Sequence, residues 1–210
     1  MVGDSWTHKI ARVCILPLVH TPVTPNHLTT VRLITGLAAC AAFAVGDRSW
    51  DIWGGWLWLL SAFLDRADGE LARVSGKTSP WGHKYDYVCD VLVTALFFVS
   101  AGIGLRDGWL GGWAIVAGVA GTLGVIAAEV LAEKIDSMKR DTGEKAYAGF
   151  AGFDFDDVLY LFAPVMWLGW QTPFVLGAAV GAPAFALLTW YKLRTLEKVV
   201  PRGGIEPPTP

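Results

Sequence analysis

The chain has 210 residues, of which 53% are hydrophobic and only 17% are charged. Soluble domains carry roughly 25% charged residues, so this composition favours one membrane-embedded domain over a soluble one. The net charge of -2 offers no basic excess for nucleic acid, and the three cysteines are too far apart for a CxxC zinc or redox site. We therefore expect no nucleic-acid partner.

The first 22 residues predict an amphipathic helix lying at the membrane interface. Apolar residues recur there at helical spacing, as Trp6, Ile10, Val13 and Pro17. The apolar run is too short for a signal peptide, and no small-residue cleavage site follows it. A helix that is apolar on one side and polar elsewhere suits the boundary between lipid and water.

Six apolar stretches follow, each expected to form a transmembrane helix of about 20 residues or somewhat fewer. They lie at about 27–45, 50–64, 85–105, 109–131, 158–170 and 174–191, separated by turn signals that include Gly46-Asp47 and Thr172-Pro173. The fold class is thus an all-α integral membrane protein with six transmembrane helices. We expect a single domain over 1–200 and a disordered tail at 201–210, which is rich in proline and glycine.

Basic residues are distributed unevenly among the connections between these stretches. The first, third and fifth connections contain only Arg48 and Arg106, whereas the other basic residues lie near the termini or in the second and fourth connections. Because Lys and Arg accumulate on the cytoplasmic side of membrane proteins, both termini and the even-numbered connections are expected in the cytoplasm.

Four aspartates stand at the cytoplasmic ends of the second and third expected helices. Asp65 and Asp68 are three residues apart, and Asp86 and Asp90 are four apart, so each pair shares one helix face. The short connection makes the two helices antiparallel neighbours, and the pairs converge. Two charges 4 Å apart repel by about 4 kcal/mol at an effective dielectric of 20. Hard divalent cations such as Mg²⁺, Mn²⁺ or Ca²⁺ would offset this repulsion, and two metals bridged by carboxylates can clamp a pyrophosphate.

The segment from Asp65 to Asp90 resembles the signature of the CDP-alcohol phosphotransferases, D-x2-D-G-x2-A-R-x8-G-x3-D-x3-D. Every fixed position is filled at its proper spacing, by Asp65, Asp68, Gly69, Ala72, Arg73, Gly82, Asp86 and Asp90. The resemblance implies transfer of a phosphatidyl group from a CDP-alcohol, expected to be CDP-diacylglycerol, to a hydroxyl acceptor. CMP would be released, and the reaction would serve phospholipid biosynthesis in the cytoplasmic membrane.

The resemblance also implies roles for individual residues. The four aspartates would bind the two metals, and Asp90 would act as the general base. Gly69 and Gly82 would let the nucleotide approach the backbone, Ser79 would place a hydroxyl near it, and Arg73 would hold the motif or the phosphates. Family members commonly form homodimers, and the fourth helix carries glycines that would allow close helix approach: Gly111, Gly112, Gly118 and Gly121.

The acceptor is less closely determined than the donor. Glu129 and Glu133 share a face near the end of the fourth helix and are the candidates for the acceptor pocket. An amine would favour carboxylates or aromatic rings, and a phosphorylated acceptor of the inositol type would favour Arg and Lys. The fourth connection offers both signs, so both stay open, as does a soluble CDP-alcohol donor. A transporter is a distant alternative, because acids within membranes also mark cation pathways.

Overall fold

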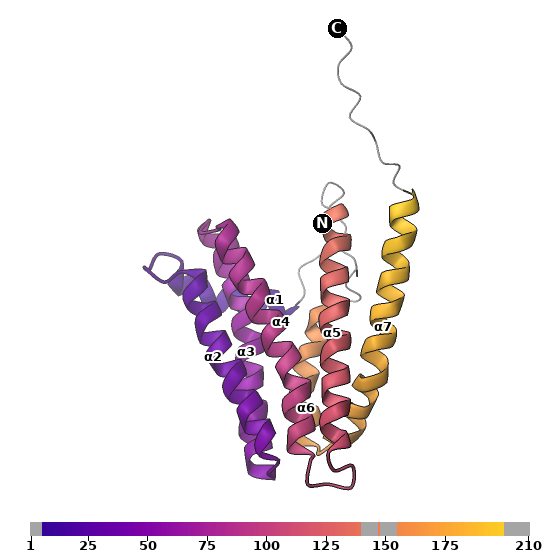
Figure 1. Cartoon of the computed structure of the whole chain (residues 1–210). Coiled ribbons are helices and arrows are strands. Elements are labelled where there is room, and N and C mark those ends of the chain that lie inside the picture. The colour runs from indigo at the N-terminus through magenta and orange to yellow at the C-terminus, as the bar shows by residue number, and fades with distance from the viewer. Residues whose placement is uncertain (1–5, 140–146, 148–154, 200–210) are drawn as a thin grey trace.

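The computed structural model describes residues 6–139, 147 and 155–199, and this part of the chain is helical between its turns and loops (Figure 1). The expected tail at 201–210 lies outside the described residues. The elements in chain order are α1 (Trp6–Ile15), a 3-10 turn (Leu16–Leu18), α2 (Pro25–Val45), α3 (Arg48–Ser75), α4 (Pro80–Gly104), α5 (Trp113–Met138), a 3-10 segment (Phe155–Leu161), α6 (Phe162–Trp167) and α7 (Gln171–Val199).

The long helices form two groups that meet along α4. In the first group α2 packs against both α3 and α4, and in the second α5 packs against α7. Helix α4 joins the groups by packing on α5, while α6 packs on α3 and α1 lies against α3 (Figure 1). The ends of α3 and α4 that carry the aspartates therefore lie beside the beginning of α2.

Local sequence sets where these helices begin and end. Helix α2 stops at Gly46, whose φ of 77° is left-handed and suits a residue without a Cβ. Asp47 caps α3 by accepting a hydrogen bond from the backbone N–H of Ser49 at 2.9 Å. Ser79 caps α4 in the same way, accepting from the backbone N–H of Gly82 at 2.9 Å. The expected turn between the second and third spans is thus short and capped where α4 begins.

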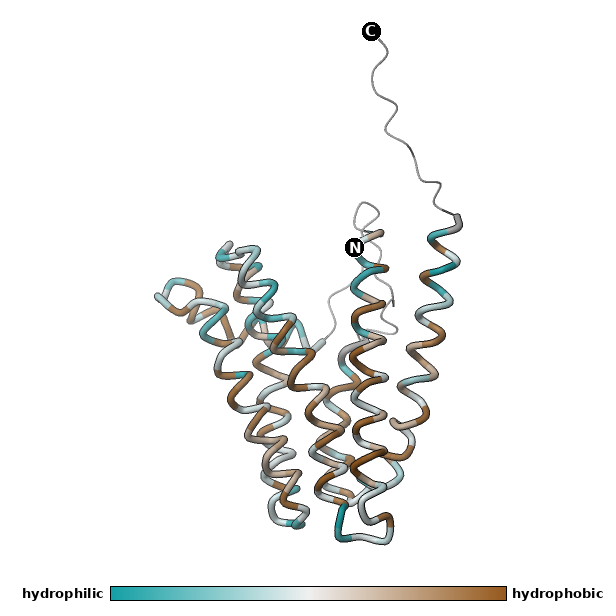
Figure 2. Tube along the Cα trace, in the orientation of Figure 1, coloured by the Kyte–Doolittle hydropathy of each residue, from teal (hydrophilic) through white to brown (hydrophobic). Residues whose placement is uncertain are grey.

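In the described part of the chain, four helices are long and apolar enough to cross a membrane, namely α2, α4, α5 and α7. Helix α3 has 28 residues, but its second half carries the charged residues of the motif. The fifth predicted span corresponds to a shorter apolar helix, Asp157–Trp167. Figure 2 shows hydrophobic residues along the middles of the helices and hydrophilic ones toward their upper ends and in the lower loop between α4 and α5. This distribution agrees with the composition of a membrane protein.

Aromatic side chains hold α2, α3, α4 and α6 together below the aspartates. Phe97 is fully buried, and its ring lies 4.7 Å from that of Trp58 and 4.6 Å from that of Phe162, centroid to centroid. Trp58 also donates its indole N–H to the carbonyl oxygen of Leu159 at 2.8 Å. Tilted and edge-on aromatic pairs contribute about 0.5–1.5 kcal/mol each beyond their buried area. This core fixes the register of α3 against α4 and so of the two aspartate pairs.

Two of the glycines considered for pairing two copies of the chain serve contacts within one chain. A Cβ at Gly118 would lie 2.4 Å from the carbonyl oxygen of Phe98, and one at Gly121 would lie 3.4 Å from the Cβ of Ala178. These two glycines therefore let α5 approach α4 and α7. Gly111 and Gly112 precede α5, which begins at Trp113 instead of at residue 109. The expectation that all four glycines lie on one helix was wrong.

Candidate active site

Three carboxylates converge where α3 ends and α4 begins. One oxygen from each of Asp65, Asp68 and Asp86 lies within 4.8 Å of the others. Helical spacing aligns the first two on α3. Helices α3 and α4 both pack against α2, so α2, and not the direct α3–α4 packing expected from the short turn, brings Asp86 to them. Three carboxylate oxygens this close are a donor set that suits a hard divalent cation. The predicted convergence of the two aspartate pairs is thus observed for three of the four side chains.

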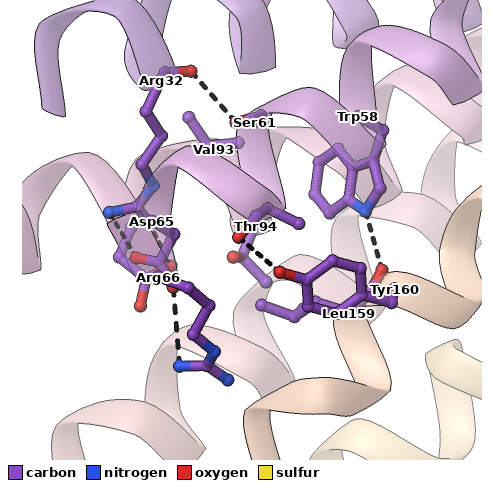
Figure 3. Close-up of a pocket in the computed structure, with 11 residues that line it drawn as sticks. Arg32, Trp58, Ser61, Asp65, Arg66, Val93, Thr94, Leu159 and Tyr160 are labelled. Carbon is purple, nitrogen blue, oxygen red and sulfur yellow. Dashed lines mark hydrogen bonds and ion pairs between the residues drawn. The ribbon is translucent and has the colours of Figure 1, made fainter. Parts of the chain in front are cut away.

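Arg32 of α2 lies among the same aspartates and also reaches the fourth. Its Nη1 is 2.8 Å from Asp65 Oδ1 and 2.8 Å from Asp86 Oδ1, and its Nη2 donates to Asp90 Oδ1 at 2.6 Å. Figure 3 shows the Arg32 side chain extending from α2 toward Asp65. Arg32 is only 3% exposed, so its positive charge acts at short range and is poorly screened. It orients Asp65, Asp86 and Asp90 relative to one another.

Asp68 is oriented by a second residue of α2. Thr29 donates its hydroxyl to Asp68 Oδ2 at 2.8 Å, from one helical turn before Arg32. Asp68 is 3% exposed and lies beyond the apolar stretch of α3 that ends near residue 64. Burial, and then the carboxylates of Asp86 and Asp65, raise the pKa of Asp68 to about 8. A cation bound here would offset that repulsion, and the residues present therefore fit a divalent metal.

A cavity of about 470 Å³ adjoins the carboxylates on the side of the α3–α4 turn. We call it the Gly69 pocket; it is lined by Thr24, Pro25, Asn26, Thr29, Asp68, Gly69, Ala72, Lys77, Thr78, Ser79, Gly82, His83 and Asp86. A Cβ at Gly82 would lie 3.0 Å from both Asn26 Oδ1 and Ser79 Oγ, so this wall tolerates no side chain without adjustment. A Cβ at Gly69 would meet no atom nearer than 3.9 Å, so a side chain there would occupy the cavity. Gly69, Ser79 and Gly82 are therefore brought together with two aspartates.

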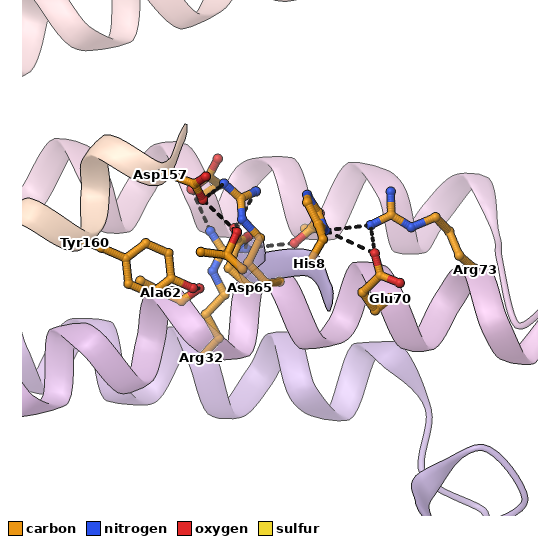
Figure 4. A network of polar contacts seen from close by, with 12 residues as sticks. His8, Arg32, Ala62, Asp65, Glu70, Arg73, Asp157 and Tyr160 are labelled. Atoms are coloured by element: carbon orange, nitrogen blue, oxygen red, sulfur yellow. Dashed lines mark hydrogen bonds and ion pairs between the residues drawn. The ribbon is translucent and has the colours of Figure 1, made fainter. Parts of the chain in front are cut away.

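Arg73 follows Gly69 by one helical turn, and its Nη2 lies 3.9 Å from where a Cβ at Gly69 would stand. It does not line the Gly69 pocket, and its Nη2 donates to Glu70 Oε1 at 2.5 Å and lies 3.0 Å from His8 Nδ1. Figure 4 shows His8, Glu70 and Arg73 converging there. These contacts agree with the expectation that Arg73 holds the motif, and its nearness to Gly69 leaves the expectation of a phosphate contact open.

Asp90 lines a second cavity, of about 400 Å³, between α4 and the helices of the other group. We call it the Glu129 pocket; it is lined by Tyr87, Asp90, Thr94, Phe98, Val125, Ala128, Glu129, Ala132, Glu133, Asp136, Tyr147, Val158, Leu159, Phe162, Ala182 and Phe185. Both predicted acceptor residues, Glu129 and Glu133, stand in this wall. Asp90 thus lies between the carboxylate group, which it meets through Arg32, and a separate cavity.

The fold and the site together define a helical protein with spans apolar enough for a membrane and with a carboxylate group, able to hold a metal, beside a cavity. The chain belongs to the CDP-alcohol phosphatidyltransferase family, whose model matches residues 22–190. That family is one of transferases, which argues against the transporter alternative. Members of this family use divalent metals, in agreement with the carboxylate group.

Two relatives illustrate the similarity. The archaetidylinositol phosphate synthase of Pyrococcus horikoshii is 34% identical over 87 residues, which cover 41% of this chain and 45% of that protein. The match thus spans under half the length of this curated relative. The crystal structure of Mycobacterium tuberculosis phosphatidylinositol phosphate synthase with CDP-DAG bound shares the fold, with a TM-score of 0.58 and 18% identity over 90% of each chain.

The sequence did not point to three of the residues that shape this site. Arg32 belongs to the first apolar stretch, and only the structure shows that it is buried among aspartates. Thr29 stands one turn before Arg32, so the shared face of α2 was a signal that a helical wheel would have revealed. Glu70 falls at a variable position of the motif, and only its burial marks it.

Proposed function

We propose that this protein transfers a phosphatidyl group from CDP-diacylglycerol to the hydroxyl of an acceptor and releases CMP. The observation that carries the proposal is the convergence of Asp65, Asp68 and Asp86 within 4.8 Å, with Asp68 and Asp86 in the wall of a 470 Å³ cavity. That cavity also exposes Gly69, Ser79 and Gly82, the residues expected to receive the nucleotide. The Mycobacterium tuberculosis synthase holds CDP-DAG in its crystal structure, which supports CDP-diacylglycerol over a soluble CDP-alcohol as donor.

The aspartates would hold two divalent metals, Mg²⁺ or Mn²⁺. Asp65, Asp68 and Asp86 supply the grouped oxygens, and we propose Asp90 as the fourth ligand. Such metals, when bound, neutralise the charge of the CDP pyrophosphate and of the leaving CMP. Thr29 keeps Asp68 oriented through its 2.8 Å hydrogen bond, and Arg32 keeps the other three carboxylates in register.

Asp90 is the proposed general base. Asp90 lines the Glu129 pocket and accepts a hydrogen bond from Arg32. It therefore stands between an acceptor hydroxyl in that pocket and the cluster of Asp65, Asp68 and Asp86. The hydroxyl oxygen of the acceptor attacks the phosphorus distal to cytidine. Asp90 accepts the proton of that hydroxyl in the same step. The bond between that phosphorus and the oxygen of CMP breaks, and CMP leaves. Most of the rate enhancement then comes from positioning and charge stabilisation.

The Glu129 pocket is the proposed acceptor site, with Glu129 and Glu133 as its polar contacts. The names of both relatives record phosphorylated inositol lipids as products, so a phosphorylated polyol is the alternative acceptor. Among the described lining residues, however, every charged side chain is acidic: Asp90, Glu129, Glu133 and Asp136. Tyr87 adds an aromatic ring to the same wall, whereas the ring of Tyr147 already has the ammonium of Lys192 4.5 Å from its centroid. Carboxylates beside aromatic rings favour an amino alcohol or an uncharged polyol over a phosphomonoester.

The test is release of CMP from CDP-diacylglycerol by purified protein in detergent, with single acceptors added in turn. We expect activity with Mg²⁺ or Mn²⁺, its loss after exhaustive chelation, and its return when metal is added back. Serine, ethanolamine, inositol, inositol phosphate and glycerol phosphate form the acceptor panel. Full activity after chelation would exclude the metal mechanism, and turnover with inositol phosphate alone would establish the phosphorylated alternative.

We also propose six transmembrane spans, with α3 and the Asp157–Trp167 helix as the second and fifth, and both termini in the cytoplasm. Exposed tryptophans support a membrane boundary at the end opposite the aspartates, where Trp50, Trp109, Trp113 and Trp170 stand near the odd-numbered connections. In a Cys14→Ser background, which removes the exposed native thiol, cysteine at Gly76 should label from the cytoplasm and cysteine at Gly108 from the other side. Reversed labelling would overturn the orientation.

Helix α1 is proposed to lie in the cytoplasmic interface of the membrane. Its outward residues Trp6, Ile10 and Val13 are 50%, 48% and 68% exposed, whereas Ala11 and Ile15 on the other side are buried. A homodimer is proposed as well, from the resemblance and not from the glycines of α5. Light scattering in mild detergent distinguishes a dimer from a monomer.

A further inference from the structure

Glu70 is a buried carboxylate that the proposed reaction does not use. It lies on α3 two residues after Asp68, and its side chain has no exposed area. Arg12 of α1 donates through Nε to Glu70 Oε2 at 2.8 Å, while His8 Nδ1 and Arg73 Nη2 lie 3.0 Å and 2.5 Å from Oε1. Both oxygens are therefore engaged, by partners on two helices. A carboxylate buried this completely is stable only while such partners stay in place.

Around Asp68 the two sides of α3 have different neighbours. Asp68, Gly69 and Ala72 line the Gly69 pocket, whereas Glu70 and Arg73 are absent from its wall and meet α1 instead. Ala67, one residue before Asp68, and Leu71, three residues after it, also face α1, because both are buried in a cluster with Ile15. The position of α1 thus bears directly on the turn of α3 that carries a proposed metal ligand.

A second chain of contacts leads from α1 to another of the aspartates. Thr7 donates its hydroxyl to Asp157 Oδ1 at 2.8 Å, and Arg66 Nη2 donates to the same oxygen at 3.4 Å. The other terminal nitrogen of Arg66 lies 3.7 Å from Asp65 Oδ2. Figure 4 shows Asp157 and Asp65 at one end of this network and Glu70 at the other. Helix α1 is therefore tied to α3 beside both Asp65 and Asp68.

We propose that Glu70 is a positioning residue which, through Arg12, His8 and Arg73, fixes α1 against α3 and thereby holds Asp65 and Asp68 in the geometry that binds metal. We call these four residues the α1 latch. The proposal rests on the proposed function, because it concerns the metal site of that reaction. Glu70 touches neither substrate nor metal in this scheme. It acts by keeping the end of α3 rigid, as partners behind metal ligands do in other sites.

The outward face of α1 gives the latch a further consequence. Trp6, Ile10 and Val13 point away from α3 and are exposed, so the helix that secures the metal site also presents an apolar surface of the kind that binds lipid. Detaching α1 from the membrane would strain the same contacts that hold Glu70. The latch therefore couples the lipid surface, where a CDP-diacylglycerol donor resides, to the metal site.

The test measures Mn²⁺ binding to the full-length protein in detergent, in the presence of CDP, from the electron paramagnetic resonance signal of free Mn²⁺. Partners behind metal ligands typically contribute ~10–100-fold to affinity, and we expect Glu70→Gln to weaken binding by about tenfold. Glu70→Asp keeps the charge and should recover part of the loss. Arg12→Gln combined with Glu70→Gln should be no weaker than Glu70→Gln alone, because both changes open the same latch. Measurements are made well below the unfolding temperature of each variant.

The matched control is Glu197→Gln, which breaks the 2.9 Å ion pair between Lys134 of α5 and Glu197 of α7 without touching α1 or α3. It should leave Mn²⁺ affinity unchanged. Wild-type affinity in folded Glu70→Gln would overturn the latch as a positioning device. If that variant does not fold, Arg12→Gln carries the test, since Arg12 is 43% exposed and its loss leaves two partners on Glu70; unchanged affinity there overturns the proposal. A wild-type protein that binds no Mn²⁺ overturns the proposed function itself.

Discussion

Asp86 and Asp90 lie one turn apart on α4, yet they belong to different regions of the molecule. Asp86 stands in the wall of the Gly69 pocket, which is built from the ends of α2, α3 and α4. Asp90 stands in the wall of the Glu129 pocket, which is built from α4 through α7. The first region takes most of its polar groups from one 26-residue motif, and hydrogen bonds from Thr29 and Arg32 fix them. The second combines carboxylates and aromatic rings from distant parts of the chain.

The contrast between the Gly69 pocket and the Glu129 pocket indicates that a short motif can specify binding of the donor but not of the acceptor. Every CDP-alcohol donor has the same CDP part, which needs the same metal ligands and the same glycines that let it approach the backbone. A short segment of sequence can supply both. An acceptor differs in size and charge, and its pocket depends on how separate helices meet. Changes in the Gly69 pocket should therefore affect donor binding, and changes in the Glu129 pocket should affect the acceptor.

The largest expected effect separates Asp90 from Asp68. Asp90→Asn keeps the shape of the side chain but cannot accept a proton, and loss of a general base typically costs ~10²–10⁴-fold in turnover. We expect that loss with donor affinity largely kept. Asp68→Asn should damage both, because its charge helps to hold the metals that bind the pyrophosphate. CMP release and calorimetric binding of CDP-diacylglycerol measure the two quantities.

Equal loss of donor binding in the two variants would show that Asp90 is chiefly a metal ligand and belongs to the donor region. Near-normal turnover of Asp90→Asn would remove proton abstraction from its role. Either result would mean that Asp86 and Asp90 do not divide the donor region from the acceptor region on α4.

A smaller effect is expected at the nucleotide wall. Gly82→Ala places a Cβ 3.0 Å from Asn26 Oδ1 and Ser79 Oγ, so the wall must shift toward the cavity. We expect the KM for CDP-diacylglycerol to rise by about tenfold, or about 1.4 kcal/mol, with the KM for the acceptor unchanged. Gly177→Ala is the control, since a Cβ there meets nothing within 4 Å. A change confined to the acceptor KM would contradict the assignment of this pocket to the donor.

The smallest effect is expected on the acceptor side. Glu133→Gln removes one charge from the Glu129 pocket, and the loss of one hydrogen bond of about 0.5–1.5 kcal/mol predicts a two- to tenfold rise in the KM for an amino alcohol. Donor affinity should stay unchanged, and a phosphorylated acceptor should be used slightly better. Asp107→Asn, at the opposite end of the molecule, is the charge-matched control. If Glu133→Gln weakens only the binding of the donor, the Glu129 pocket binds the donor and the assignment of the two pockets is wrong.

The sequence by itself determined the helices and half of the site. The turn at Gly46-Asp47 placed the end of α2 and the start of α3 to within a few residues, because capping and turn formation depend on neighbours along the chain. Spacings of three and four put each aspartate pair on one face for the same reason. The end of α3 was not placed, since the helix continues beyond the expected limit at 64 to Ser75.

Only the tertiary structure decided what surrounds those aspartates. Arg32 meets Asp86 and Asp90 across 54 and 58 residues, and Glu70 meets Arg12 across 58. Periodicity gives the face on which a side chain lies but not the helix that packs against that face. Gly118 shows the same limit, since close approach was expected from its small size and the partner proved to be α4 of the same chain. Contacts between distant segments arise from the packing of whole helices, which no local pattern encodes.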